Sequence, residues 1–344
     1  HPDIIIFQDY DKGVLTQVFS TGSAFAALRA DGSLAVWGDS ANGGCYIQAP
    51  LLDGTNAVTQ VFSTALGALA ARRADGSLVT WGHTYYGGDS SAVAAMLNGT
   101  IDVTHVFSTV GAFAALRTDG SLVTWGDSSR GGDSSAVAAK LDGSIDVTQV
   151  YSSGSAFAAL RADGSVVTWG NSSFGGNSSG VESKLNGTID VTQVFSTFGA
   201  FAALRTDGSV VTWGDLSRGG DSDAVATRLD GTIDVTQIFS TTFAFAALRV
   251  DGSLVSWGDS SFGGDSSLVA TKLDGTIDVT QVFSTFGVFA ALRADGSVVT
   301  WGSSSYGGDS SAVATRLDGT IDVTQIFSTE QAFAALRADG SVVT

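Results

Sequence analysis

Short apolar runs alternate with glycine- and aspartate-rich turns along nearly the whole chain. In residues 177–220 the runs VTQVFST, AFAALR and SVVTW are rich in β-branched, aromatic and small apolar residues, a composition typical of strands. The Asp-Gly of TDGS separates the second run from the third and predicts a tight hairpin between them. AFAALR is apolar on both faces, which suits a strand in a sheet that is covered on both sides. The pattern therefore predicts small three-stranded antiparallel sheets that pack closely on one another.

A different spacing appears between each GG pair and the next predicted first strand. In DSSAVAAKLDG, residues 133–143, Asp and Ser stand where a helix N-cap is expected, and Val137, Ala138 and Leu141 have helical spacing. A basic residue and a glycine end the segment. We expect one or two helical turns here.

These elements recur with a constant period, because tryptophan occurs every 44 residues from Trp37 to Trp301. The last copy ends before its Trp and lacks the WG…GG piece. With each GG pair taken as the end of a unit, residues 1–344 form a single repeat domain of eight units: 1–44, 45–88, 89–132, 133–176, 177–220, 221–264, 265–308 and 309–344. A period of this length in an all-β chain is typical of propeller blades.

We therefore predict an all-β fold, a β-propeller with three antiparallel strands and a short helical turn per blade. The number of copies favours eight blades, with seven as the alternative. An open superhelical array of the same units, cut from a longer protein, is a further alternative. Residues 4–7, IIIF, form a strand-like run, and we hypothesise that this segment pairs with the sheet of residues 323–344 and closes the ring.

The repeat also resembles a known family. FAALRADGSVVTWG, preceded by VTQVFST in residues 279–308, resembles the regulator of chromosome condensation repeat. The short period is similar to the secreted bacterial branch with three-stranded blades, typified by β-lactamase inhibitory protein II. The resemblance implies a propeller, usually seven-bladed, that binds other proteins through one face. The chain departs from the pattern in its eight copies, in GGDS for GQLG, and in Leu69, Phe113 and Phe157 where the family has histidine.

The charge of the chain argues against one class of partner. The 344 residues include 34 acidic and 17 basic side chains, for a net charge of -17 at pH 7, and the basic residues do not cluster. Such a surface repels nucleic acid, so we expect no nucleic-acid partner. Almost all the acids are Asp, which favours turns and helix caps.

Residues that could carry out chemistry are sparse. His1, His83 and His105 stand at positions that differ in the other copies, and no nucleophile elbow or paired-histidine motif occurs. Cys45 is the only cysteine, so an intramolecular disulfide or a cysteine-rich metal site is impossible. No apolar run approaches the roughly 18 residues of a membrane span. We expect no enzyme, no cofactor and no membrane span, while an active site built from Asp carboxylates stays an alternative.

The WGDSSFGGDSS loop from Trp257 invites two interpretations. Asp259 and Asp265 supply hard oxygen ligands, so they are weak candidates for a calcium site. Their spacing lacks the alternating ligands of an EF-hand, however. The favoured interpretation is structural: Asp259 closes an Asx-type turn, the glycines adopt positive φ, and Asp265 caps the short helix.

Variation among the copies marks a candidate binding surface. The residue before each GG pair changes while its neighbours stay nearly constant: Asn42, Tyr86, Arg130, Phe174, Arg218, Phe262 and Tyr306. The link after the first strand also varies, and it includes Phe198, Phe243 and Phe286. In a three-stranded antiparallel sheet both positions lie at the same end, opposite the DGS hairpin. Tyr, Phe and Arg concentrate binding energy at interfaces, so we predict a partner-binding surface there. The alternative is that these residues drift and simply cover the blade ends.

The sequence thus favours a non-enzymatic protein-binding or scaffold propeller, for instance a module of a large repetitive bacterial surface or secreted protein. Its expected location is extracellular or at the cell surface, and self-association is a further expectation. An inhibitor of a secreted enzyme such as a β-lactamase, and a purely structural array segment, are the alternatives.

Overall fold

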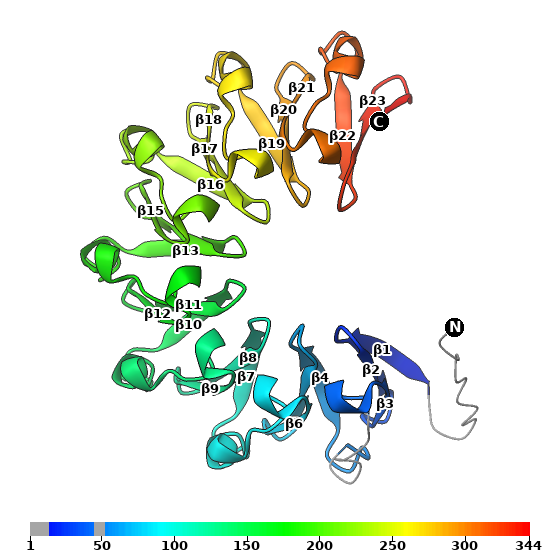
Figure 1. Cartoon of the computed structure of the whole chain (residues 1–344), viewed down its shortest axis with the longest axis vertical. Helices are drawn as coiled ribbons and strands as arrows, with labels where there is room; N and C mark the ends of the chain where they lie inside the picture. Colours follow the sequence, from blue (N-terminus) through cyan, green and yellow to red (C-terminus); the bar gives the residue numbers. More distant parts are fainter. Residues whose placement is uncertain (1–13, 45–51) are drawn as a thin grey trace. The chain divides into compact units, whose positions relative to one another are not determined.

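The computed structural model describes residues 14–44 and 52–344, which form eight three-stranded antiparallel sheets. In each sheet the strands lie in chain order (Figure 1). The first strands are β1 (Leu15–Ser20), β4 (Val58–Ser63), β7 (Val103–Ser108), β10 (Val147–Ser152), β13 (Val191–Ser196), β16 (Val235–Ser240), β19 (Val279–Ser284) and β22 (Val323–Ser328). The second are β2 (Ala24–Arg29), β5 (Ala68–Arg73), β8 (Ala112–Arg117), β11 (Ala156–Arg161), β14 (Ala200–Arg205), β17 (Ala244–Arg249), β20 (Val288–Arg293) and β23 (Phe333–Arg337). The third are β3 (Leu34–Gly38), β6 (Leu78–Gly82), β9 (Leu122–Gly126), β12 (Val166–Gly170), β15 (Val210–Gly214), β18 (Leu254–Gly258), β21 (Val298–Gly302) and β24 (Val342–Val343).

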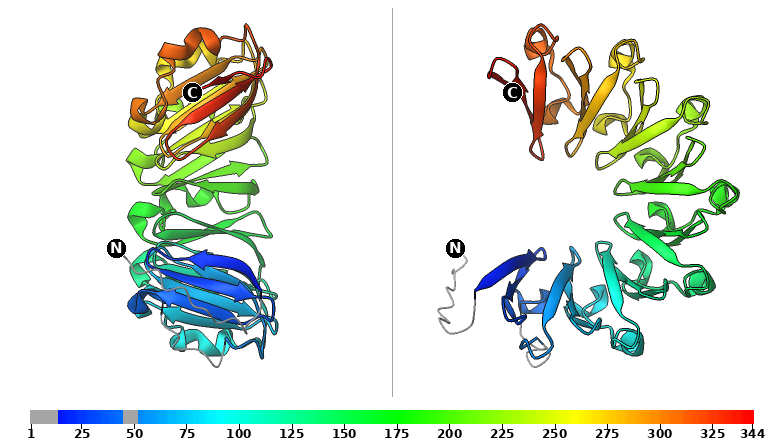
Figure 2. Two further views of the ribbon diagram at one scale, coloured as in Figure 1. Left: turned by 90° about the vertical axis from the view of Figure 1, so that its right-hand side faces the viewer. Right: turned by 180° about the vertical axis from the view of Figure 1, so that it is seen from behind.

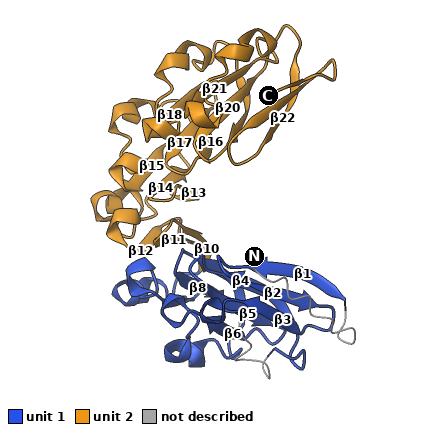
Figure 3. Cartoon of the chain, turned by 45° about the vertical axis from the view of Figure 1, so that its right-hand side comes forward, with its two compact units in different colours: residues 1–146 blue, residues 147–344 orange. Residues whose placement is uncertain are grey.

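The chain divides into two compact units, residues 1–146 and 147–344 (Figure 3). The described part of the first contains the sheets from β1 to β9, and the second contains those from β10 to β24. Within the second unit the sheets stand side by side in chain order (Figure 2). The predicted all-β fold of eight three-stranded repeats is confirmed. The hypothesis that residues 4–7 close a ring, and also His1 and Cys45, lie outside the described residues.

Burial along the strands follows the residue types. In β13, Val191 and Val194 are buried while Thr192 and Gln193 are exposed. Along β14 every residue from Ala200 to Leu204 is buried, so the prediction of a strand covered on both faces is confirmed. The hairpin between β14 and β15 turns at Gly208, whose φ of 72° is unfavourable for residues that carry a Cβ.

The core lies between successive sheets rather than within them. Ala156, Ala158 and Leu160 of one sheet pack against the next sheet, which contributes Phe201 and Trp213. The rings of Phe201 and Trp213 stack with centroids 5.3 Å apart. The phenylalanine that replaces the histidine of the resembling family is therefore a fully buried core residue.

The predicted helical turns are present as six-residue 3-10 helices. Residues 133–143 were expected to contain one, and Ser135–Lys140 forms it. The buried Leu141 follows, and its carbonyl accepts a hydrogen bond of 2.9 Å from Leu122 N–H of the third strand. Within residues 14–44 and 52–344 these helices are η4 (Ser91–Met96), η6 (Ser135–Lys140), η8 (Ser179–Lys184), η10 (Asp223–Arg228), η12 (Ser267–Lys272) and η14 (Ser311–Arg316).

A second 3-10 turn, which the sequence pattern did not predict as helical, occupies each WG…GG loop. The variable residue is its last residue in every described copy. These turns are η1 (Ser40–Asn42), η3 (Thr84–Tyr86), η5 (Ser128–Arg130), η7 (Ser172–Phe174), η9 (Leu216–Arg218), η11 (Ser260–Phe262) and η13 (Ser304–Tyr306).

Candidate functional site

The links after the first strands and the WG…GG loops lie at one end of each sheet, as predicted; we call this the variable-loop end. The hydroxyl of Thr197, at the start of a link, donates to the carbonyl of Arg218 at 2.9 Å. The N–H of Asp215 donates to the carbonyl of Gly199 at 2.9 Å. The DGS hairpins lie at the opposite end, because Leu204 pairs with Val210 while Ala200 pairs with Gly214.

Local turn chemistry holds most of the variable residues in place. Asp259 accepts a hydrogen bond of 2.8 Å from Ser261 N–H and is the N-cap of η11, so the predicted Asx-type turn is confirmed. Gly263 follows Phe262 with φ of 94°, and a Cβ there would lie 2.7 Å from the Phe289 ring. The loop therefore needs glycine for its conformation and for its close approach to the next sheet.

The prediction that Asp265 caps the helix needs a small correction. The N-cap of η12 is Ser266, and Asp265, one residue earlier, accepts a hydrogen bond of 2.8 Å from Ser267 N–H. This backbone hydrogen bond lowers the pKa of Asp265. Among the described residues no group of three His, Cys, Asp or Glu is arranged to hold a metal ion. Asp259 and Asp265 stay weak candidates for calcium binding, and the structural interpretation stays the favoured one.

The tryptophans connect the loop of one repeat to the next. Trp213 Nε1 donates at 3.0 Å to the carbonyl of Gly175, which directly follows Phe174. A Cβ on Gly175 would lie 2.5 Å from the ring of Phe201, so the loop is pressed onto the core of the following sheet. The position of Phe174 is thereby set by a buried hydrogen bond and by close packing.

In residues 147–344 the variable residues form one continuous row of rings, which we call the aromatic row: Phe174, Phe198, Phe243, Phe262, Phe286 and Tyr306. Neighbouring rings meet edge to face, a favourable arrangement. The centroid distances along the row are 5.6 Å, 6.2 Å, 4.6 Å, 5.5 Å and 5.5 Å in this order. Phe198 is 41% exposed and the other rings are partly buried. Three of the rings come from WG…GG loops and three from links, so all six predicted aromatic residues of this unit come together.

Arg218 lies inside the aromatic row. Its guanidinium carbon is 4.7 Å from the centroid of Phe243 and 5.8 Å from those of Phe174 and Phe198. Its Nε is 3.4 Å from a carboxylate oxygen of Asp215, and 31% of its side chain is exposed. Cation–π contacts of this kind stabilise an arginine against apolar rings.

The backbone beneath the row is hydrogen-bonded from repeat to repeat, which the sequence did not reveal. Phe198 N–H donates to Thr242 O at 2.9 Å, Thr242 N–H to Phe286 O at 3.1 Å, and Phe286 N–H to Glu330 O at 3.0 Å. Gly154 N–H donates in the same way to Phe198 O at 2.8 Å. These bonds restrain the links, so the rings are presented from a rigid backbone.

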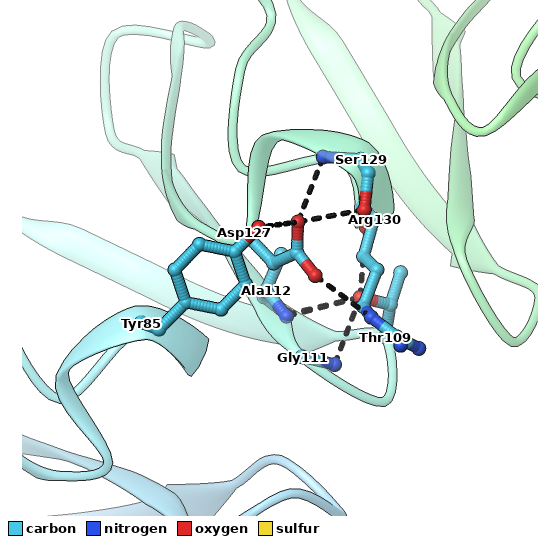
Figure 4. A network of polar contacts seen from close by, with 7 residues as sticks. All are labelled: Tyr85, Thr109, Gly111, Ala112, Asp127, Ser129 and Arg130. Carbon is cyan, nitrogen blue, oxygen red and sulfur yellow. Dashed lines mark hydrogen bonds and ion pairs between the residues drawn. The ribbon is translucent and has the colours of Figure 1, made fainter.

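In residues 1–146 the variable-loop end contains a network of polar contacts around Asp127 (Figure 4). The carboxylate of Asp127, in a residue only 3% exposed, accepts hydrogen bonds from Tyr85 Oη at 3.1 Å and Ser129 N–H at 2.9 Å. It also accepts one from Arg130 Nε at 2.8 Å. Burial opposes ionisation, but these hydrogen bonds outweigh it and lower the pKa of Asp127. The hydrogen bond from Tyr85 Oη to Asp127 raises the pKa of Tyr85.

The two variable arginines therefore differ. Arg130 is held by Asp127, and its guanidinium carbon is 5.9 Å from the ring of Tyr86. Sequence reasoning missed Asp127 and Tyr85. The signal was present, because Tyr85 replaces the Ser that precedes the variable residue in most copies.

Asn42, the variable residue of the first repeat, contacts the link of the second repeat. Its side chain packs against Gly67, where a Cβ would lie 2.4 Å from the amide oxygen. The link of the second repeat, residues 65–67, is one residue longer than the other links. Asn42 thus contacts a link that is longer than its counterparts in the other repeats.

The two histidines in the described part of the chain, His83 and His105, have different surroundings. His83 is the N-cap of η3 and makes no side-chain cap hydrogen bond. His105 lies in β7 with its ring 6.3 Å from that of Phe107. None of the helices in the described residues is long and apolar enough to cross a membrane.

No protein-family model and no curated protein matches the sequence. Solved structures of similar fold include the ectodomain of the Physcomitrella patens receptor kinase CR4, at 14% identity over 72% of this chain and 62% of that chain, with a TM-score of 0.40. Human WBSCR16 has 15% identity over 82% of each chain and a TM-score of 0.44. Yeast RCC1 (Prp20), solved with Kap60, has 16% identity over 84% of this chain and 70% of that chain, with a TM-score of 0.42. This chain therefore spans less than two thirds of the receptor ectodomain.

Similarity at this level carries no conclusion about the family or function of this chain. The resemblance to the bacterial branch stays a prediction. The chain is an all-β protein whose described residues form eight three-stranded antiparallel repeats of the propeller-blade type.

Proposed function

We propose that this chain is a non-enzymatic protein-binding repeat domain whose partner docks on the variable-loop end of residues 147–344. The observation that carries the proposal is the aromatic row with Arg218 inside it. Six rings and one arginine, drawn from four successive repeats, form a single partly exposed surface. Aromatic residues and arginine dominate the energetically important part of protein interfaces.

The rigidity of this surface favours binding. The links are hydrogen-bonded to the next repeat, and the loops are anchored through tryptophan and glycine contacts. A surface that is already ordered loses little conformational entropy when a partner binds. Rings held edge to face therefore form a preorganised docking site.

The opposite end of the sheets has a different character. Its arginines serve the DGS hairpins: Arg205 Nε donates to Ser209 Oγ at 2.8 Å, and its NH2 lies 3.2 Å from Asp207. The same Arg-x-Asp-x-Ser arrangement recurs from repeat to repeat with little variation. This end therefore supplies structure, and the variable-loop end supplies the residues that can distinguish partners.

The test is capture of a partner by the purified chain, with matched substitutions at the two ends. We expect F198A/R218A to abolish capture while the circular dichroism spectrum stays that of the folded chain and the melting temperature falls by less than about 10 °C. V250A/L268A is the control, because Val250 and Leu268 are 68% and 101% exposed and lie outside the aromatic row. Equal capture by wild type and F198A/R218A would overturn the proposal.

Inhibition of a secreted β-lactamase and an extracellular or cell-surface location are proposals that rest on sequence resemblance. A chromogenic β-lactam hydrolysis assay with added chain tests the first directly. Slower hydrolysis with wild type but not with F198A/R218A would identify the enzyme as the partner.

A further inference from the structure

A pocket of about 450 Å³ opens at the variable-loop end between the first two repeats. It exists because the residues around it are small: Gly22, Ser23, Ala41 and Asn42 on one side, and Ala65 and Gly67 of the longer link on the other. A volume of this size is in the range of ligand-binding pockets. The pocket thus results from a local departure from the repeat.

The far wall of the pocket is aromatic. Tyr86 and His83 both line it, and their ring centroids are 4.3 Å apart with planes inclined by 35°. Nδ1 of His83 is inaccessible to solvent and has no hydrogen-bond partner in the described residues. Leu66 completes the wall, and none of the lining residues is an acid, a lysine or an arginine. The pocket therefore suits an uncharged group that has an apolar face.

The repeat itself indicates which group fits. Gly22 corresponds by the 44-residue period to Phe198 and Phe286, and Asn42 corresponds to Phe174, Phe262 and Tyr306. In residues 147–344 these positions hold rings that pack edge to face. At the first repeat the positions are occupied by glycine and asparagine, so the space that a ring would take is open.

We propose that this pocket receives one aromatic side chain of the protein partner, which packs against Tyr86 and His83. The inference rests on the proposed function and specifies part of the partner's chemistry. Tyr86 and His83 would contribute ring contacts, and the side-chain amide of Asn42 offers a hydrogen bond to the polar edge of a Trp or Tyr. In the first repeat the occupant takes the place that ring side chains hold at the corresponding positions of later repeats.

The test uses the whole chain and two neutral probes, N-acetyl-tryptophanamide and N-acetyl-leucinamide. Titration is followed by saturation-transfer NMR and by the imidazole signals of His83. We expect the tryptophan amide to bind about twofold to tenfold more tightly than the leucine amide, the range that ring pairs contribute beyond apolar burial. Equal affinities, or no saturable binding of the tryptophan amide below about 10 mM, would overturn the inference.

Two substitutions locate the binding. N42F fills the pocket with the residue found in later repeats, and we expect about tenfold weaker binding of the tryptophan amide. Y86L keeps apolar volume but removes a ring, so the preference for the aromatic probe should disappear. L216A, at a residue 71% exposed in a loop of the second unit, is the control and should bind as wild type. Unchanged binding to N42F would show that the pocket is not the site.

The outcomes separate this inference from the proposed function. F198A/R218A changes residues of the second unit and leaves the pocket intact. If F198A/R218A lost partner capture and the tryptophan amide did not bind the wild-type chain, the pocket inference would be refuted and the proposed function would stand. If the tryptophan amide bound and F198A/R218A captured the partner as well as wild type, docking on the aromatic row would be refuted and the pocket would stand.

Discussion

If the aromatic row serves recognition, removing one of its rings should cost much less stability than removing a core ring three residues away. F198A and F201A provide this comparison within one repeat. Phe201 is fully buried and stacks on Trp213, whereas Phe198 is 41% exposed. Truncation of a buried phenylalanine costs about 3–5 kcal/mol.

The expected cost of F198A follows from its contacts. Phe198 meets Phe174 and Phe243 at 5.6 Å and 6.2 Å and lies 5.8 Å from the Arg218 guanidinium. Each ring pair contributes about 0.5–1.5 kcal/mol when buried, and an exposed cation–π contact about 0.5–1 kcal/mol. Partial exposure and the remaining row contacts reduce the sum, so we expect F198A to lower the free energy of unfolding by about 1–2 kcal/mol.

Urea unfolding followed by tryptophan fluorescence measures both variants, with hydrogen exchange reporting on each sheet, because repeat proteins unfold by segments. F201A should also change the emission of Trp213 in the folded state. A loss for F198A as large as that for F201A would refute the reasoning, because the row would then be part of the core. A loss below about 2 kcal/mol for F201A would contradict the assignment of Phe201 to the core.

Three further predictions concern local structure. D127N should cost about 1–3 kcal/mol, because the buried site loses a charged hydrogen-bond acceptor. The pKa of Asp127 is lowered in the folded state. Its contribution to the free energy of unfolding is therefore present above the unfolded pKa of about 3.9 and is lost as pH falls through the folded value. Melting temperatures measured from pH 2 to 7 should fall less steeply on the acid side in D127N than in wild type. G164A should lower the free energy of unfolding by at least about 1–2 kcal/mol, because φ of Gly164 is 72° and the new Cβ would lie 2.5 Å from Asp190. The control is G180A, since Gly180 has open space around it. In the same urea assay G180A should be neutral or stabilising by up to about 1 kcal/mol. Added calcium should leave the melting temperature unchanged, because Asp259 and Asp265 already accept backbone hydrogen bonds. A rise of several degrees would identify a calcium site if a chelator reversed it and D259N abolished it.

Interactions inside one repeat could be predicted from the sequence because they are local and recur along the chain. The Asp-Gly hairpins, the strand apolar on both faces, and the turn closed by Asp259 each depend on residues a few positions apart. Backbone conformational preference and hydrophobic periodicity act over this range, so the fold of the repeat and the end where variable residues gather followed from residue order.

Contacts between repeats were decided only by the tertiary structure. Phe174 and Phe198 come from different repeats, as do Tyr85 and Asp127, and no periodicity specifies how close successive sheets bring them. That distance depends on the side-chain volumes packed between sheets and on the backbone bonds between links. For this reason the sequence by itself determined the blade and its variable positions. Only packing between blades joined six rings into a row, placed Arg218 within it, and left a pocket beside Asn42.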